Sequence, residues 1–144
     1  MKIRNAAKKD LPQMLKLLEQ LQPLDPPIDE NAALAAFEQA ERNGVLYFIA
    51  EEGGLLVGAC YAAIIPNITR NCSPICFIEN VVTSSDCRRR GIGRKLIEAA
   101  IEYAKAQGCY KVTLQSGIKR IEAHKFYEAA GFDGASKRAF ELRF

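Results

Sequence analysis

The chain reads Arg88-Arg89-Arg90-Gly91-Ile92-Gly93-Arg94 at the point where an apolar, strand-like segment gives way to a segment with helical periodicity. Backbone N–H groups at a helix N-terminus have no intrahelical partner, and the helix macrodipole adds positive charge at the same place. Glycines without a Cβ atom let a phosphate come close to the backbone, and arginines supply further charge. The stretch therefore predicts a strand, a tight turn and a helix that together can bind a pyrophosphate group.

The same stretch also fits a plain helix entry with solvated arginines. Its spacing matches neither the pattern of a P-loop nor the GxGxxG pattern of a dinucleotide-binding fold at a first strand. The meaning of the turn therefore depends on its place in the chain and on the motif that follows it.

Length and composition indicate one domain spanning residues 1–144. Hydrophobic residues make up 49% of the chain and charged residues 26%, as in an ordinary soluble globular protein. The net charge is only +3, which argues against a general nucleic-acid binder. We find neither a stretch that could span a membrane nor a signal peptide, so we expect a cytoplasmic protein with no membrane partner.

The five cysteines are an odd number in a chain without a recognisable secretory signal, which favours reduced thiols over a disulfide framework. Cys72 and Cys76 are close enough in sequence to suggest a metal pair. Because the chain holds a single histidine and no second pair at ligand spacing, we expect no metal.

The hydrophobic pattern predicts an alternating order of strands and helices. Asp10 and Gln13 are spaced as a capping box, Asp29 starts a second helix, and Gly53-Gly54 is a hairpin signal. We expect strands at residues 2–5, 45–51, 55–65, 75–83, 109–115 and 135–144, and helices after Asp10, at about 29–43, at 93–107 and at 121–130. The early hairpin and the later strand–helix–strand units indicate an α/β protein with a mixed sheet and helices on both faces.

Two motifs, in this order, resemble those of the GNAT superfamily of N-acetyltransferases. The acetyl-CoA motif of that family is Arg/Gln-x-x-Gly-x-Gly/Ala, and Arg88-Arg89-Arg90-Gly91-Ile92-Gly93 matches it. The second motif is a helix with an aromatic pair before an Ala-Gly-Phe ending, here Ala123-His124-Lys125-Phe126-Tyr127-Glu128-Ala129-Ala130-Gly131-Phe132. The resemblance implies a single GNAT-like domain over essentially the whole chain. Its mixed, mostly antiparallel sheet would have six or seven strands, splay at a cofactor cleft, and carry about four helices on both faces.

The resemblance also implies that acetyl-CoA is the co-substrate. The pantetheine arm would pair with the backbone around Val81 and Val82, between strands that splay apart. The pyrophosphate would lie on the amides from Arg89 to Arg94. Relatives often have an asparagine near the start of the late helix; this chain has Lys119-Arg120-Ile121-Glu122 there, so Ser116 or Lys125 would replace that contact. The cofactor-binding residues expected are Val81, Val82, Arg88, Arg89, Arg90, Gly91, Ile92, Gly93, Arg94, Ser116, Phe126 and Tyr127.

Direct attack of a primary amine on a thioester, through a tetrahedral intermediate, needs a base for the amine and an acid for the leaving thiolate. The resemblance makes Tyr127 the candidate acid, with its hydroxyl near the CoA sulfur; a tyrosine pKa of about 10 exceeds the roughly 8.5 of a thiol. Glu79 is the candidate base, directly or through water. Each residue also has a purely structural reading. Simple alternation puts Glu79 and Val81 on one face of their strand and Asn80 and Val82 on the other, unless a bulge intervenes.

The sequence leaves the acceptor amine open. Residues 116–127 resemble aminoalkylphosphonate N-acetyltransferases, and Ile78-Glu79 with Gly108-Cys109-Tyr110-Lys111 resembles glucosamine-phosphate N-acetyltransferases. Both act on small amines with an anionic group, which Arg70, Lys119, Lys137 and Arg138 could bind. The loop between the first two helices carries Asp25, Asp29 and Glu30, which would suit a polyamine or a protein lysine. His124, the single histidine, is favoured for helix or substrate contacts over direct chemistry.

We therefore expect an acetyl-CoA-dependent N-acetyltransferase that acts on a primary amine of a small molecule. The alternatives are a protein or polyamine N-acetyltransferase and a non-catalytic CoA-binding module on the same fold; the presence of both Glu79 and Tyr127 favours an enzyme. Nucleic acid is disfavoured as a partner because no aromatic platform adjoins the arginines. The tail at 139–144 would leave an unprotected edge in a monomer, so we expect a homodimer.

Overall fold

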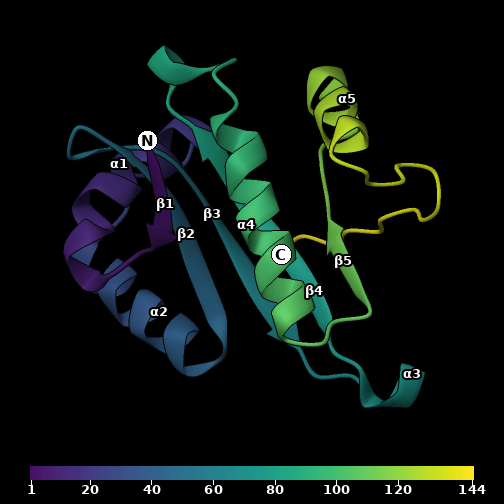
Figure 1. Cartoon of the computed structure of the whole chain (residues 1–144). Helices are drawn as coiled ribbons and strands as arrows, with labels where there is room; N and C mark the ends of the chain where they lie inside the picture. Colours follow the sequence, from purple (N-terminus) through teal and green to yellow (C-terminus); the bar gives the residue numbers. More distant parts are fainter. The chain divides into compact units, whose positions relative to one another are not determined.

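One sheet organises the fold, with its strands side by side in the order in which they follow along the chain (Figure 1). The first four strands pair antiparallel, each with the next. The strands are β1 (Lys2–Asn5), β2 (Val45–Glu52), β3 (Leu55–Ile65), β4 (Ile75–Thr83) and β5 (Lys111–Leu114). The predicted fold class fits, but the sheet has five strands instead of six or seven. The tail at 135–144, predicted as a last strand, contains no strand or helix.

The computed structural model describes all of residues 1–144, which cluster into two compact units, Met1–Thr113 and Leu114–Phe144. The first unit holds β1 to β4, most of β5, and two short 3-10 helices, Lys8–Asp10 and Ser85–Cys87. Its α-helices are α1 (Leu11–Leu21), α2 (Glu30–Arg42), the single turn α3 (Thr69–Cys72) and α4 (Ile92–Ala106). The second unit holds α5 (Ile121–Ala129) and the tail. None of the helices is long and apolar enough to cross a membrane.

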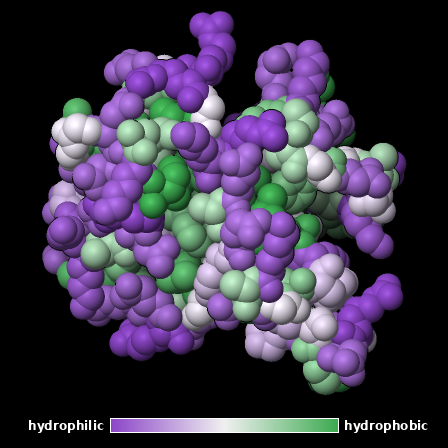
Figure 2. All heavy atoms as spheres, in the orientation of Figure 1, coloured by the Kyte–Doolittle hydropathy of each residue, from purple (hydrophilic) through white to green (hydrophobic).

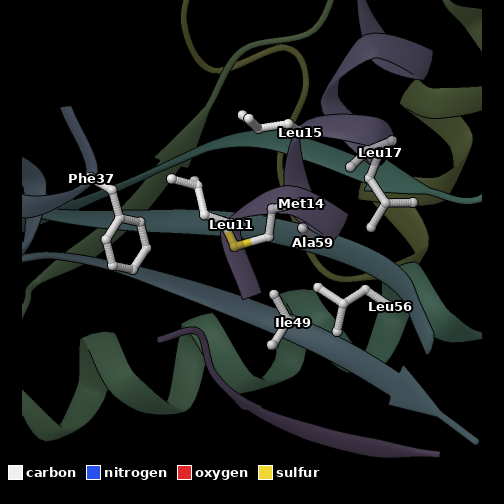
Figure 3. Close-up of a cluster of buried hydrophobic side chains, with 9 residues drawn as sticks. Leu11, Met14, Leu15, Leu17, Phe37, Ile49, Leu56 and Ala59 are labelled. Atoms are coloured by element: carbon white, nitrogen blue, oxygen red, sulfur yellow. The ribbon is translucent and has the colours of Figure 1, made fainter. Parts of the chain in front are cut away.

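In the first unit, α1 and α2 cover one face of the sheet. Ile49 and Ala59 lie opposite each other in β2 and β3, and they pack against Leu11 and Met14 of α1 and Phe37 of α2 (Figure 3). All five side chains are at least nine-tenths buried. Burial of each large apolar side chain contributes roughly 1.5–3 kcal/mol, so this cluster holds both helices on the sheet.

The opposite face of the same strands is covered by α4. Strand alternation turns Cys60 away from the α1 face, and its Sγ lies 3.9 Å from the carbonyl oxygen of Leu96 in α4. Phe48, paired with Cys60 in β2, packs its ring 5.8 Å from that of Tyr103 in α4. Over the elements of this unit, Figure 2 shows mostly hydrophilic side chains with smaller apolar patches between them.

One of the two predicted helix caps is present in the structure and the other is not. The Asp29 side chain accepts a hydrogen bond from the N–H of Ala32, which caps α2 as expected. The capping box expected from Asp10 and Gln13 is wrong. Asp10 makes no side-chain cap to α1, because its carboxylate accepts bonds from Arg4 and from the N–H of Ala7. Gln13 instead binds the backbone of the β2–β3 hairpin.

Candidate active site

The N-terminus of α4 presents unpaired backbone donors. Gly91 is the N-cap, has a left-handed φ of 74° and no side chain to cap the helix. The first backbone hydrogen bond of the helix runs from the N–H of Lys95 to the carbonyl oxygen of Gly91, at 3.2 Å. The N–H groups of Ile92, Gly93 and Arg94 therefore point out of the helix without an acceptor, at its positive end. The turn predicted from the sequence forms, and it has the chemistry of an anion site.

The four arginines of this turn are not equivalent. Arg90 donates two hydrogen bonds to the carboxylate of Glu52, at 3.0 and 2.8 Å, and Arg94 pairs with Glu98 one turn along α4, at 2.9 Å. Arg88 and Arg89 are exposed and form no ion pair. Their charge is thus uncompensated, and these two arginines supply the net positive charge of the turn.

Gly58 of β3 fixes the distance of α4 from the sheet, a role that our reading of the sequence missed. A Cβ atom at this position would lie 2.9 Å from Cγ2 of Ile92, 3.0 Å from Cδ1 of Leu96 and 3.1 Å from the carbonyl oxygen of Val82. Only glycine lets the first turns of α4 come so close. An isolated glycine in an apolar strand is the sequence signal for such an approach.

A β-bulge interrupts β4 next to the candidate base. Glu79 lies opposite Tyr61 of β3, and Val82 lies opposite Ala59. Between these two pairs, β3 has one residue, Cys60, and β4 has two, Asn80 and Val81. Strand β4 therefore carries one extra residue. Asn80, the first of the two, has a φ of 53°. Asparagine tolerates positive φ and is depleted in regular strands, which is the signal for the bulge in the sequence.

The bulge changes which side chains of β4 share a face. Simple alternation put Glu79 with Val81 and Asn80 with Val82, and that prediction is wrong. Because Tyr61 and Ala59 alternate normally in β3, their partners Glu79 and Val82 both lie on the α1 face. The Val82 side chain is buried in the cluster under α1, so only its backbone is left for a ligand. Glu79 is half-buried.

In the second unit, the loop before α5 holds an unsatisfied polar atom. The hydroxyl oxygen of Ser116 is buried and has no hydrogen-bond partner. The next carbonyl oxygen, that of Gly117, accepts from the N–H of Arg120 at 2.9 Å and lies 2.9 Å from Nε2 of His124. His124 therefore stabilises the loop before α5 through its contact with Gly117. Lys125, the alternative to Ser116 as a cofactor contact, pairs with Glu122 at 3.0 Å.

The candidate acid lies in an aromatic cluster of the second unit. Tyr127 of α5 is buried, with ring centroids 5.0 Å from Phe126 and 6.1 Å from Phe132, both edge-on. The N–H of Phe132 also donates to the carbonyl oxygen of Tyr127, at 3.1 Å. The Ala-Gly-Phe ending thus folds back on the helix and fixes the tyrosine ring.

The predicted site residues are therefore divided between the units. The first unit holds Glu79 with its bulge and the turn at 88–94; the second holds Ser116, Phe126 and Tyr127. We find no place where three His, Cys, Asp or Glu side chains could together hold a metal ion.

Comparison with known proteins supplies the family. Residues 11–132 match the acetyltransferase (GNAT) family. The chain belongs to this family. The match covers the α4 turn and the aromatic helix, and it runs through both units. The N-acetyltransferase class expected from the sequence is confirmed.

Several named relatives of this GNAT protein are acetyltransferases. Glucosamine 6-phosphate N-acetyltransferase 1 of Oryza sativa subsp. japonica is 34% identical over 122 residues, 82% of this chain and 72% of the relative. A putative acetyltransferase of Agrobacterium tumefaciens is 39% identical, with a TM-score of 0.95 over 100% of both chains. An aminoglycoside N-acetyltransferase solved in complex with CoA is 26% identical, with a TM-score of 0.83 over 99% of this chain and 93% of the other.

Proposed function

We propose that this protein transfers the acetyl group of acetyl-CoA to a primary amine of a small molecule. The observation that carries the proposal is the open N-terminus of α4, which has three unpaired backbone donors and is preceded in the chain by two arginines without ion pairs. A pyrophosphate diester is the anion that this arrangement suits, because it offers several oxygens to adjacent N–H groups. The family match and the CoA complex of a relative support the same assignment.

Two further features fit a bound CoA. The Ser116 hydroxyl is buried without a partner in the chain, and a buried polar group in that state costs about 1–3 kcal/mol unless a ligand or water satisfies it. A hydrogen bond to the pantetheine arm would do so. The bulge in β4 takes Asn80 and Val81 out of register with β3, which leaves backbone groups near Val81 for an amide chain.

The chain supplies candidates for both proton transfers. Glu79 would remove a proton from the ammonium form of the acceptor, directly or through water, so that the nitrogen lone pair attacks the thioester carbon. Tyr127 would donate its proton to the sulfur as the carbon–sulfur bond of the tetrahedral intermediate breaks. The nitrogen loses a second proton to water after the attack. Of the two protons that leave the nitrogen, one restores Tyr127 and the other is released to solvent, so the products are the N-acetylated amine and CoA with a free thiol. We propose that the two units act together as one acetyltransferase domain.

An amino sugar is the acceptor that the relatives support. Glucosamine 6-phosphate and aminoglycosides, the substrates in the names of two relatives, both carry amines on sugar rings. They differ in charge, one being anionic and the other polycationic, so the ring amine is their common feature. A protein lysine lacks that ring, and we place it second.

The experiment is an amine panel with acetyl-CoA, read by release of the CoA thiol and by the mass of the product. The panel contains glucosamine, glucosamine 6-phosphate, an aminoglycoside, an aminoalkylphosphonate, a linear polyamine and a lysine peptide. We expect thiol release that depends on an amino sugar, with one acetyl group gained by it. Thiol release that no amine stimulates, despite tight CoA binding, would instead indicate the non-catalytic CoA-binding module.

The tail supports a proposed homodimer. Phe140, Leu142 and Phe144 are 89%, 79% and 115% exposed. Three exposed large apolar side chains within five residues favour burial against a second copy of the chain. Sedimentation should give a dimer at micromolar concentration for the wild type and a monomer for the Phe140→Ser, Leu142→Ser variant. A monomeric wild type would reject the proposal.

A further inference from the structure

A row of half-buried side chains crosses three strands of the first unit and ends at the candidate base. Tyr47 of β2 lies opposite Tyr61 of β3, and Tyr61 lies opposite Glu79 of β4. Directly opposed residues of an antiparallel sheet share a face. The three side chains therefore lie side by side on the α1 face, with Phe37 of α2 packed 5.3 Å from the Tyr47 ring.

The row ends at the β-bulge in β4. Asn80 follows Glu79 directly and leaves the regular ladder, so the next side chain to return to the α1 face is that of Val82, which is buried. Glu79 is thus the last polar side chain of β4 on this face. The tyrosine rings meet edge to face at 5.4 Å, which holds Tyr61 in place beside the carboxylate.

The polar ends of the row have almost no hydrogen-bond partners in the chain. Neither tyrosine hydroxyl makes a hydrogen bond within the protein, and Glu79 contacts only the adjacent N–H of Asn80, at 3.4 Å. Burial, and secondarily the charge of Glu79, raises the pKa of Tyr61 above its usual value. At neutral pH the hydroxyl is therefore protonated and can donate. A donor hydroxyl, two aromatic rings and a carboxylate remain available to a ligand.

We propose that Tyr61 binds the acceptor and selects a sugar-borne amine over an alkyl amine. This inference rests on the proposed transfer reaction. A sugar offers both an apolar C–H surface for the Tyr61 and Tyr47 rings and a hydroxyl beside the amine that can accept from the Tyr61 hydroxyl. Its amine would then lie next to Glu79, the proposed base. A linear polyamine has no hydroxyl to satisfy Tyr61, so it would gain nothing from this contact.

The test compares Tyr61→Phe with the matched variant Tyr103→Phe. Tyr103 is also partly buried and packed against an aromatic ring, but it lies on α4, over the opposite face of the sheet. For the best amino sugar of the panel, we expect Tyr61→Phe to lower kcat/KM by about tenfold, mainly through KM, which is the worth of one hydrogen bond. The KM of acetyl-CoA and the kcat/KM of an alkyl amine should not change. Tyr103→Phe should behave as the wild type.

The outcomes separate this inference from the reaction on which it rests. An unchanged amino-sugar KM in Tyr61→Phe would overturn the role of Tyr61 and leave the transfer reaction standing. So would equal losses for the amino sugar and the alkyl amine, or a wild type that acetylates only alkyl amines. A wild type that acetylates no amine would overturn both.

Discussion

At the scale of single residues, the proposed acid and base can be told apart by pH. Tyr127→Phe keeps the ring that packs against Phe126 and Phe132, so it should keep the fold and CoA affinity. It should lower turnover by roughly 10²- to 10⁴-fold, the usual worth of one general acid. Glu79→Gln should lower turnover most at neutral pH. The turnover of this variant should recover as pH rises, because the acceptor then loses its proton to solvent without the help of a base.

Rate–pH profiles of both variants with saturating acetyl-CoA check this assignment. Losses of equal size at every pH would mean that the two roles are wrong. Full activity in Tyr127→Phe would return that tyrosine to a structural role in the aromatic cluster.

Asp10 should give the fold a specific sensitivity to acid. Its carboxylate is buried and accepts two hydrogen bonds from Arg4, at 2.7 and 2.8 Å, and one from the N–H of Ala7. Chiefly because of the bonds from Arg4, its pKa falls from 3.8 to about 2. A depressed carboxyl pKa adds stability that is present above the unfolded pKa and lost as pH falls through the folded one.

The change of pKa corresponds to about 2 kcal/mol of stability at neutral pH. We expect Asp10→Asn to lower the free energy of unfolding in urea by at least that amount at pH 7. Its deficit should shrink as the pH falls from 3.8 toward 2. The exposed Asp25→Asn is the control and should match the wild type throughout. A deficit in Asp10→Asn that does not depend on pH would show that the ion pair is not its source.

At the scale of secondary-structure elements, Gly58 should couple β3 to the position of α4. A Cβ atom there would meet Ile92 Cγ2 at 2.9 Å and a backbone oxygen at 3.1 Å. Overpacking of this kind costs about 1–3 kcal/mol. We expect Gly58→Ala to lower the melting temperature and also to weaken CoA binding, because the shift falls on the first turn of α4.

The double variant Gly58→Ala, Ile92→Ala provides the check by thermal unfolding and calorimetry. Removing the Ile92 side chain relieves the closest contact. The loss of stability in the double variant should therefore be smaller than the sum of the losses in the two single variants. Strictly additive losses would show that Gly58 does not set the distance between strand and helix.

The elements also show what sequence can and cannot predict. The turn at 88–94 and the start of α2 at Asp29 follow from local signals, and local backbone chemistry decides them. The bulge at Asn80 could be suspected but not placed, because it is defined by the partner strand. Gln13 binds the β2–β3 hairpin instead of a cap, which is a contact between segments far apart in sequence. The row from Tyr47 to Glu79 likewise exists only through the register of three strands.

At the scale of the whole molecule, the family match covers residues 11–132 and so includes parts of both units. We propose that the first unit binds the pyrophosphate and that the second unit supplies the proton donor. Removing either the α4 turn or Tyr127 should therefore abolish efficient transfer for different reasons, one through binding and the other through chemistry.

Calorimetry of CoA with the wild type, Gly91→Val and Gly44→Val tests whether the N-terminus of α4 binds the pyrophosphate. Both glycines have a φ of 74° and open space where a Cβ atom would lie, so both substitutions force a β-branched residue into the same positive φ. Only Gly91 begins α4. We predict a CoA dissociation constant at least about tenfold higher in Gly91→Val, as expected when a side chain takes the place of a phosphate that binds backbone N–H groups, with Gly44→Val equal to the wild type. Equal CoA affinity in a folded Gly91→Val protein would contradict the claim that the N-terminus of α4 holds the pyrophosphate.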